Sequence, residues 1–180
     1  TNVIEFGVDR GGTLTTISKF VKDSSEIYAL DSFGFFSDDI KSNVTKYDPH
    51  YLGTYRPFTK KTRFRNFNYL ALEKQLNEIL IKKESNLNII KCYFPEKIDD
   101  EIFKKISSIK YSFVHVDFDL YKPTLDVIKF VIPRHEKNAI ILLDYYNLIS
   151  QEGVKWAVRD SGVNISKCIQ TQSGQLICYT

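Results

Sequence analysis

The sequence predicts an α/β protein in which helices cover both faces of a mostly parallel β-sheet. Three observations support this fold class. Apolar runs of strand length alternate five times with helix-period stretches. A turn-linked pair of strand-like runs closes the chain, and acidic residues follow several of the runs. Right-handed crossovers build this pattern into a three-layer αβα sandwich, so we expect a seven-stranded sheet that ends in an antiparallel β-hairpin.

Length and composition indicate one ordinary globular domain. The chain of 180 residues is long enough for a single core, so residues 1–180 are treated as one domain. Hydrophobic residues make up 43% and charged residues 26%, which excludes a disordered chain. The net charge of +3 is too small to indicate nucleic acid as a partner. The basic residues between 56 and 65 fit a solvated loop better than a grip on phosphates or an acidic substrate.

Membrane insertion and disulfide bonding are not expected. The sequence has no run of about 18 apolar residues and no signal peptide. The three cysteines lack metal-ligand spacing, so we predict reduced thiols in a cytoplasmic protein. Because a predicted strand begins within two residues of Thr1, native residues are expected to precede it. The oligomeric state stays open, and a homo-oligomer is compatible with the composition.

The first predicted strand, residues 3–7, runs into a glycine turn and then a helix through residues 14–21. Glycine lets the backbone approach a ligand, and the amino end of the helix offers free N–H groups. Gly7, Gly11 and Gly12 are spaced G-x-x-x-G-G, which differs from the dinucleotide pattern G-x-G-x-x-G. The turn therefore predicts a phosphate or nucleoside ligand, although such turns also occur without one.

The second predicted strand, residues 26–31, ends in an acid. Asp31 lies 24 residues after Gly7, where an acidic side chain can accept hydrogen bonds from both ribose hydroxyls of an adenosine-containing ligand. A turn or cap role for Asp31, with Ser32 beside it, is the alternative. The spacing favours the ribose role.

The stretch from 34 to 65 loses helical and strand periodicity. It is polar, with prolines, glycine and scattered aromatic residues, which predicts a long loop that we interpret as a lid or substrate-binding insertion. The remaining predicted elements are a helix at 66–83, a strand at 87–92, a helix at 95–106, a strand at 113–116, a helix through 125–132, a strand at 138–144, a helix at 152–159, and hairpin strands at 165–170 and 175–180.

The most informative stretch runs from Phe113 to Thr124. An apolar run ends abruptly in Asp117 and Asp119, followed by a proline that suits the first turn of a helix. A helix cap would explain Asp119 but would leave Asp117 at the tip of an apolar strand without a role. Since Glu5, Asp31 and Asp144 also fall at or near strand carboxyl ends, we predict a functional site along that edge of the sheet.

At this level of detail the sequence resembles the class I S-adenosylmethionine-dependent methyltransferases, which are Rossmann-like. More narrowly, it resembles the macrocin O-methyltransferase family, which methylates sugar hydroxyls. The resemblance covers nearly the whole chain outside the lid region. It depends on residues 3–12, 30–33, 89–94, 114–124, 140–146 and 153–158, of which Val114–Thr124 is the most specific.

The resemblance implies a donor site and a metal site. Glu5 and the turn from Gly7 to Gly12 would approach the methionine end of S-adenosylmethionine, while Asp31 would hold the ribose. It also implies Mg²⁺ at Asp117 and Asp144. The family pattern has an adjacent pair of acids at residues 144 and 145, and here the second is a tyrosine, which is a poor Mg²⁺ ligand at neutral pH. Cys92 replaces the usual glycine, and the larger side chain would either crowd the donor or shift the loop.

Methyl transfer needs two positioned reactants and a group that collects the acceptor proton. Asp119 is our candidate base or substrate contact, because it follows Asp117 by two residues and would point the same way on a continued strand. A cap role for it is the alternative. His115 alternates with Asp117 but is predicted to be packed core. Tyr121, Tyr145 and Tyr146 are predicted either to line an acceptor pocket or to pack in the core.

Three functions fit this pattern. The first is an O-methyltransferase acting on a small polar acceptor, such as a sugar of a surface polysaccharide or secondary metabolite. The second is a protein with the same fold that binds a ligand or partner without chemistry, which the tyrosine at 145 and Cys92 suggest. The third is a nucleotide-sugar enzyme with Asp117 and Asp119 as a D-x-D metal site. It is the least favoured, since only Lys122 lies nearby to bind phosphate.

Overall fold

A computed structural model describes residues 1–33, 43–49 and 68–179 of the chain. Most of the predicted lid therefore lies outside the described residues. The strands are β1 (Asn2–Phe6), β2 (Glu26–Asp31), β3 (Asn86–Lys91), β4 (Tyr111–Val116), β5 (His135–Leu143), β6 (Cys168–Gln170) and β7 (Leu176–Tyr179). The helices are α1 (Gly12–Phe20), α3 (Tyr69–Leu80), α4 (Asp100–Ser107), α5 (Tyr121–Val131) and α6 (Glu152–Asp160), with short 3₁₀ helices η2 (Ile81–Lys83), η3 (Ile132–Arg134), η4 (Ile149–Gln151) and η5 (Ile165–Lys167).

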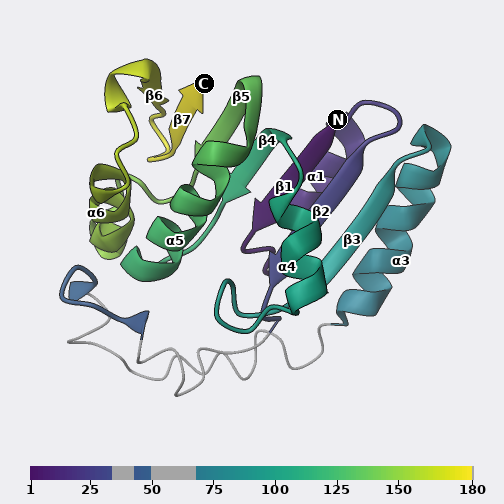
Figure 1. Cartoon of the computed structure of the whole chain (residues 1–180), viewed down its shortest axis with the longest axis horizontal. Coiled ribbons are helices and arrows are strands. Elements are labelled where there is room, and N and C mark those ends of the chain that lie inside the picture. The colour runs from purple at the N-terminus through teal and green to yellow at the C-terminus, as the bar shows by residue number, and fades with distance from the viewer. Residues whose placement is uncertain (34–42, 50–67, 180) are drawn as a thin grey trace.

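The seven strands form one sheet in the order β3-β2-β1-β4-β5-β7-β6 (Figure 1). The first five pair in parallel, and β7 pairs antiparallel with both β5 and β6. This confirms the predicted mostly parallel sheet with a C-terminal antiparallel hairpin. Strand order reverses between β1 and β4, so the carboxyl ends of these two strands flank a topological switch point.

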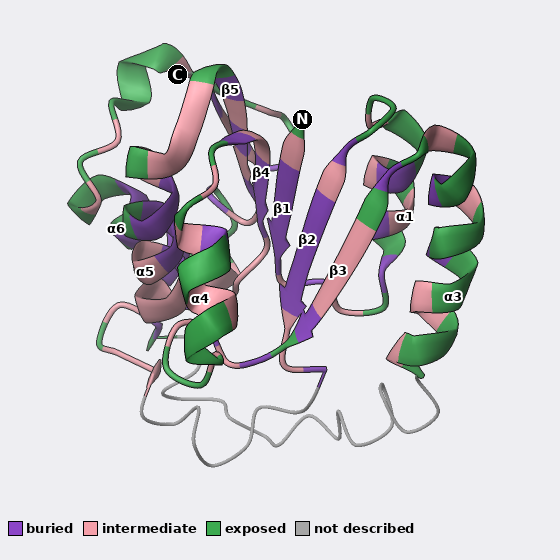
Figure 2. Ribbon diagram, turned by 45° about the vertical axis from the view of Figure 1, so that its right-hand side comes forward, coloured by how far each residue is buried: buried purple, intermediate pink, exposed green. Residues whose placement is uncertain are grey.

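Helices cover both faces of the sheet, which confirms the three layers (Figure 2). One apolar cluster, with Val3, Leu14 and Leu76 among its members, packs β1 and β2 against α1 and α3. A second cluster, with Phe6 and Val127 among its members, packs the other face against α4, α5 and α6. Because side chains alternate along a strand, β1 contributes to both clusters, and its buried Glu5 lies on the same face as Val3.

Two predicted elements need correction. The helix predicted from residue 95 begins at Asp100, because Asp99 is its N-cap and accepts hydrogen bonds from the backbone N–H groups of Glu101 and Ile102. The first half of the predicted hairpin strand at 165–170 is instead the 3₁₀ helix η5, capped by Asn164. In both cases a polar capping residue, Asp99 or Asn164, determines where the helix begins.

The prediction of three reduced cysteines is wrong for two of them. Cys168 and Cys178 are opposite each other on β6 and β7 and are joined by a disulfide. Cross-strand neighbours in an antiparallel pair approach closely enough for this bond, which sequence spacing alone did not reveal. Cys92 is free and buried, as predicted. Its side chain belongs to the apolar core, and burial raises the pKa of its thiol to about 12.

Among the described residues, no helix is both long enough and apolar enough to cross a membrane.

Candidate active site

Four acidic residues lie at one edge of the sheet. Asp31 is the last residue of β2, Asp117 and Asp144 directly follow β4 and β5, and Glu5 is one residue from the end of β1. Asp117 and Asp144 each donate a backbone N–H to the neighbouring strand, at Phe6 and Val116. The sheet register therefore continues one residue past each strand and fixes the backbone at both acids.

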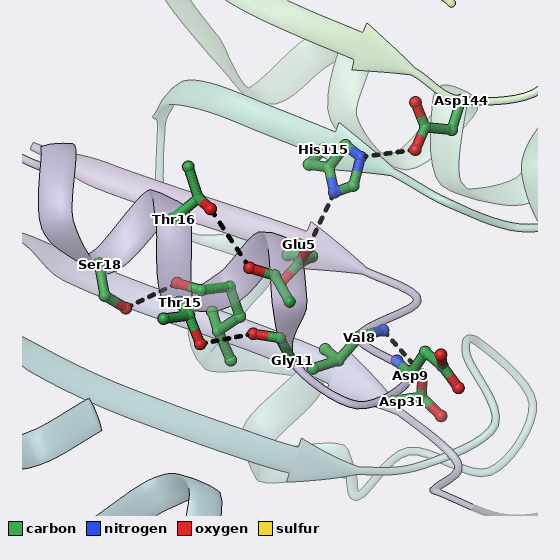
Figure 3. A network of polar contacts seen from close by, with 12 residues as sticks. Glu5, Val8, Asp9, Gly11, Thr15, Thr16, Ser18, Asp31, His115 and Asp144 are labelled. Carbon is green, nitrogen blue, oxygen red and sulfur yellow. Dashed lines mark hydrogen bonds and ion pairs between the residues drawn. The ribbon is translucent and has the colours of Figure 1, made fainter. Parts of the chain in front are cut away.

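The glycine turn is held closed by the acid at the end of β2. One carboxylate oxygen of Asp31 accepts hydrogen bonds from the backbone N–H groups of Val8, at 2.7 Å, and Asp9, at 2.9 Å (Figure 3). Its other oxygen accepts from the backbone of Phe33 at 2.7 Å and lies 3.5 Å from the hydroxyl of Ser32. These contacts give Asp31 the turn role, which was the alternative to the favoured ribose role. Each carboxylate oxygen has two lone pairs, so these four contacts use all of them, and the contact with Ser32 is the longest.

The three glycines of the turn have different surroundings. Gly7 has φ +89°, and a Cβ there would overlap the carbonyl of Asp117, so this glycine permits close approach of β1 and β4. Gly11 has φ +79°, and a Cβ would overlap the side chain of Leu72 on α3. A Cβ on Gly12 would meet nothing within 4 Å. Only Gly12 leaves open space in which a ligand could approach the backbone.

A buried hydrogen-bonded chain joins two of the strand-end acids. Glu5 and His115 are register partners on β1 and β4, and Nδ1 of His115 lies 2.9 Å from Oε1 of Glu5. Nε2 of His115 lies 3.4 Å from Oδ2 of Asp144 (Figure 3). The exposed fractions of the three side chains are 0% for Glu5, 1% for His115 and 20% for Asp144. His115 is buried, as predicted, but it bonds two carboxylates rather than packing only against apolar neighbours.

These contacts shift the pKa values of the groups in opposite directions. Burial alone would lower the pKa of His115, but the hydrogen bonds and charges of Asp144 and Glu5 raise it to about 9. Burial raises the pKa of Asp117 to about 7, and the charge of Asp144 adds to that rise. For Asp144 itself, burial is outweighed by the hydrogen bonds of His115 and Gln175 and by the charge of His115, and its pKa is lowered. One acid is therefore held ionised beside another that titrates near neutral pH.

The residues also fit a divalent cation. A ring nitrogen of His115 and one carboxylate oxygen each from Asp117 and Asp144 lie within 4.8 Å of one another. Within the described part of the chain, Oδ1 of Asp144 is buried and has no hydrogen-bond partner. Carboxylates suit Mg²⁺ and Mn²⁺, with waters filling the remaining positions. The two predicted metal residues are thus brought together.

Residues 43–49, the described part of the predicted insertion, rest on the start of α5. Asp48 is 2% exposed, and its Oδ1 accepts a hydrogen bond of 2.8 Å from the backbone N–H of Tyr121. Its Oδ2 accepts from the backbone and hydroxyl of Thr45, both at 2.9 Å. A Cβ at position 153 would overlap Oδ1 of Asp48, so Gly153 at the start of α6 leaves room for this contact. Asp48 therefore fixes the helix that directly follows Asp117 and Asp119.

Aromatic residues lie between the start of α5 and a cavity beside α6. The ring of Tyr47 lies 4.5 Å from that of Tyr121 and 5.4 Å from that of Trp156. Trp156 and Tyr146 line a cavity of about 460 Å³ beside α6, a volume typical of small-molecule sites. Of the three tyrosines proposed for an acceptor pocket, Tyr146 both lines this cavity and is mostly buried, so its two predicted roles are not exclusive. Tyr121 and Tyr145 are not among its lining residues.

Comparison with solved structures agrees with this arrangement, whereas no family model and no curated protein matches the sequence. The O-methyltransferase NovP is similar with a TM-score of 0.69 and 17% identity, over 99% of this chain and 71% of that one. CalS11, a calicheamicin methyltransferase, has a TM-score of 0.65 and 18% identity, again over 99% and 71%. A second structure of CalS11 is described as a TDP-rhamnose 3′-O-methyltransferase.

Structures with lower TM-scores share the fold. An O-methyltransferase from Bacillus cereus in complex with S-adenosylhomocysteine has a TM-score of 0.54 and 10% identity, over 99% of this chain and 73% of that one. A protein described as an rRNA methylase from Clostridium thermocellum has the same TM-score. At such identities the comparison establishes the fold alone. This chain has the fold of S-adenosylmethionine-dependent methyltransferases, and the narrower resemblance to the macrocin family stays a prediction.

Two features of the site were not predicted from the sequence. These are the hydrogen bonds of His115 to Glu5 and Asp144, and the contact of Asp48 with the backbone of Tyr121. Glu5 lies opposite His115 only through the register of β1 with β4, which neither strand's sequence specifies. Asp48 gave no signal in the sequence either, because its partner Tyr121 lies 73 residues away and contributes only a backbone N–H.

Proposed function

We propose that this chain is an S-adenosylmethionine-dependent O-methyltransferase that methylates a hydroxyl of a small polar acceptor. The observation that carries the proposal is the position of four acids and a glycine turn at one edge of a sheet with methyltransferase topology. Donor, base and cation ligands would then lie at neighbouring strand ends, where open α/β sheets bind their ligands.

Donor binding is assigned to the β1 and β2 ends. The open space at Gly12 admits a ligand against the backbone, next to the turn that Gly7 and Gly11 shape. Within the described residues, Oε2 of Glu5 is buried without a hydrogen-bond partner, which suits a donor group such as the ammonium of the methionine part. The ribose is assigned to Asp31, where a ribose hydroxyl would replace the long contact of the neighbouring Ser32 hydroxyl on Oδ1.

The reaction forms one C–O bond and breaks one C–S bond, while the acceptor hydroxyl loses its proton. A carboxylate that titrates near neutral pH is suited to take that proton. Asp117 has such a pKa, about 7, when no cation is bound to it. Asp119 follows two residues later and is the second candidate for base or substrate contact. Positioning of the two reactants in line would supply most of the remaining rate enhancement.

A divalent cation, when bound, would lower the pKa of the acceptor hydroxyl and orient it. Asp117 and Asp144 would hold it, and Mg²⁺ is the ion that the resemblance implies. Tyr145, at φ +60°, takes the position of the expected second acid and offers no carboxylate. Fewer charged ligands would make binding weaker, so we expect activity to depend on millimolar rather than micromolar Mg²⁺.

The acceptor is proposed to be a sugar or other small molecule. NovP and CalS11, which have the highest TM-scores among the similar structures reported above, are described as O-methyltransferases, one of them acting on TDP-rhamnose. The cavity beside Trp156 is the proposed place for part of this acceptor. A nucleic-acid acceptor is not part of the proposal, because the net charge is only +3. A cytoplasmic location is still proposed, without support from the cysteines, since Cys168 and Cys178 are paired.

Isothermal titration calorimetry with S-adenosylmethionine and S-adenosylhomocysteine, with and without Mg²⁺, tests the proposal. We expect both to bind. Asp31→Ala, which removes both carboxylate oxygens, should abolish binding, while Asp31→Asn keeps one acceptor oxygen and should weaken it less. Asp126→Ala, which removes a surface ion pair with Lys122, is the control and should bind normally.

The outcomes separate the candidate functions. Binding of both molecules followed by methyl transfer to a sugar panel supports the enzyme. Binding without transfer to any acceptor, even at high Mg²⁺, favours the ligand-binding protein without chemistry, which Tyr145 motivates. Binding of a nucleotide sugar in place of both molecules would overturn the proposal in favour of a D-x-D enzyme at Asp117 and Asp119.

A further inference from the structure

His115 lies between Glu5, which is assigned to the donor, and Asp144, which is assigned to the cation. Its ring nitrogens lie 2.9 Å from Glu5 on one side and 3.4 Å from Asp144 on the other. Glu5 comes from β1 and Asp144 follows β5, so the ring connects two strand ends that do not pair with each other. The side chains of Glu5 and His115 are buried, so water cannot readily replace the bond between them.

Each carboxylate that His115 contacts has a second oxygen with no bonding partner. Oε2 of Glu5 and Oδ1 of Asp144 are both buried and lack hydrogen bonds within the described residues. A buried acceptor without a partner is costly, and a ligand that supplies a donor or a cation removes that cost. Each acid can therefore bind a hydrogen-bond donor or a cation through its free oxygen while its other oxygen stays bonded to the imidazole ring of His115.

We infer that His115 is a positioning residue that couples ligand binding at Glu5 to ligand binding at Asp144. The identity of the two ligands, donor and divalent cation, rests on the proposed function. A cationic group on Oε2 of Glu5 neutralises that carboxylate and weakens its bond to His115, so the ring bonds more strongly to Oδ2 of Asp144. A metal on Oδ1 of Asp144 then meets a carboxylate whose charge the ring already shares. Occupation of either side weakens the other, and thermodynamic linkage makes the two effects equal.

Two variants of His115 can each keep one of its two hydrogen bonds and lose the other. The amide nitrogen of Asn reaches about as far as Nδ1 of histidine, so His115→Asn can keep the bond to Glu5 and lose Asp144. The longer His115→Gln can reach the place of Nε2 and keep the bond to Asp144 instead. The coupling needs both bonds, so either variant should remove it. Val116→Ala is the matched control, because it trims a buried β4 neighbour on the opposite face.

The first measurement needs no ligand. Urea unfolding midpoints are compared for Glu5→Gln, Asp144→Asn and the double variant at one fixed pH. With His115 present, the midpoint shift of the double variant should differ from the sum of the single shifts, since both acids share one ring. In the His115→Asn or His115→Gln background the shifts should add. Additive shifts with His115 present would overturn the inference, whatever the ligands are.

The second measurement is calorimetry of S-adenosylhomocysteine with and without Mg²⁺. In the native chain and in Val116→Ala, Mg²⁺ should raise the Kd at least about fivefold, the lower end of typical couplings. In both His115 variants the change should fall below about twofold. A native Kd that Mg²⁺ leaves unchanged contradicts the inference. If S-adenosylhomocysteine does not bind at all, the proposed function fails, and the unfolding comparison still decides the coupling.

Discussion

At the scale of single residues, two glycines of one turn have opposite requirements. Gly7 adopts φ +89° with the carbonyl of Asp117 in the place of a side chain, whereas Gly12 faces open space. The first glycine is needed for folding and the second is proposed to be needed for the donor. Substitutions at Gly7 and Gly12 should therefore affect different properties: the first the free energy of unfolding, the second the affinity for the donor.

Gly7→Ala should destabilise the protein by about 2 kcal/mol or more, because it adds strain at positive φ and an overlap with backbone. Gly12→Ala should stay within about 1 kcal/mol of the native chain, since alanine there restricts the unfolded state without a clash. The second variant should nevertheless raise the Kd of S-adenosylhomocysteine about tenfold or more. Urea unfolding and calorimetry measure the two effects. Equal destabilisation by both variants would contradict this assignment.

Asp117 should make stability depend on pH. Its folded pKa of about 7 exceeds the ordinary 3.8, so the folded chain binds this proton more tightly than the unfolded chain does. The stabilisation is fully present below about pH 4 and is lost as pH rises through about 7. Asp117→Asn should remove this decrease in the free energy of unfolding with rising pH. The decrease is at most a few kcal/mol, because one pKa unit corresponds to about 1.4 kcal/mol. Unfolding in EDTA between pH 4 and 8 measures it, with Asp126→Asn as control.

The carboxylate positions could be predicted from the sequence, and the contacts of His115 could not. Asp31, Asp117 and Asp144 each follow an apolar run, which marks a strand end without knowledge of the neighbours. The bond between Glu5 and His115 joins residues 110 positions apart and depends on strand register. A single strand pattern contains no register, so His115 looked like an ordinary core residue.

At the scale of elements, α5 begins without a cap of its own. Its N-cap residue Leu120 has no side-chain hydrogen bond, and Asp48, from a distant segment, supplies the acceptor instead. Helix starts with an unsatisfied N–H are costly when buried. The helix that follows Asp117 and Asp119 therefore depends on a residue of the predicted insertion.

Asp48→Ala should cost about 1–2 kcal/mol, the usual effect of losing a helix cap. Asp99→Ala removes the cap of α4, which comes from the residue directly before that helix, and should cost a similar amount. Only the Asp48 variant should also reduce methyl transfer, because only α5 continues from the acidic loop. Unfolding and transfer rates are measured on both. Equal transfer rates in the two variants would argue against a positioning role for Asp48.

Element boundaries were less predictable than element types. The helices α1, α3, α5 and α6 and the strands β1 to β5 were all placed within a few residues, since their apolar periodicity is strong. The errors at α4 and η5 arose where a capping Asp99 or Asn164 outweighed the apolar pattern around it. The contact of Asp48 with α5 had no local pattern at all.

At the scale of the whole molecule, the sheet order brings the acids together. β1 lies between β2 and β4, and β4 lies next to β5, so four acid-bearing strands are consecutive neighbours. Right-handed crossovers and five alternations of strand and helix predict a mostly parallel three-layer sheet. They leave the order of the strands open, because several orders satisfy the same rule, so that order is known from the structure. The acceptor could not be predicted, because the residues expected to select it lie mostly in the insertion, which has no periodic pattern.

A crystal structure of the chain with S-adenosylhomocysteine tests whether the acids at the strand ends form the donor site. We expect the ribose hydroxyls against the carboxylate of Asp31, the homocysteine end beside Gly12 and Glu5, and the sulfur facing Asp117. A ligand bound elsewhere, such as in the cavity beside Trp156 with the glycine turn empty, would contradict this expectation.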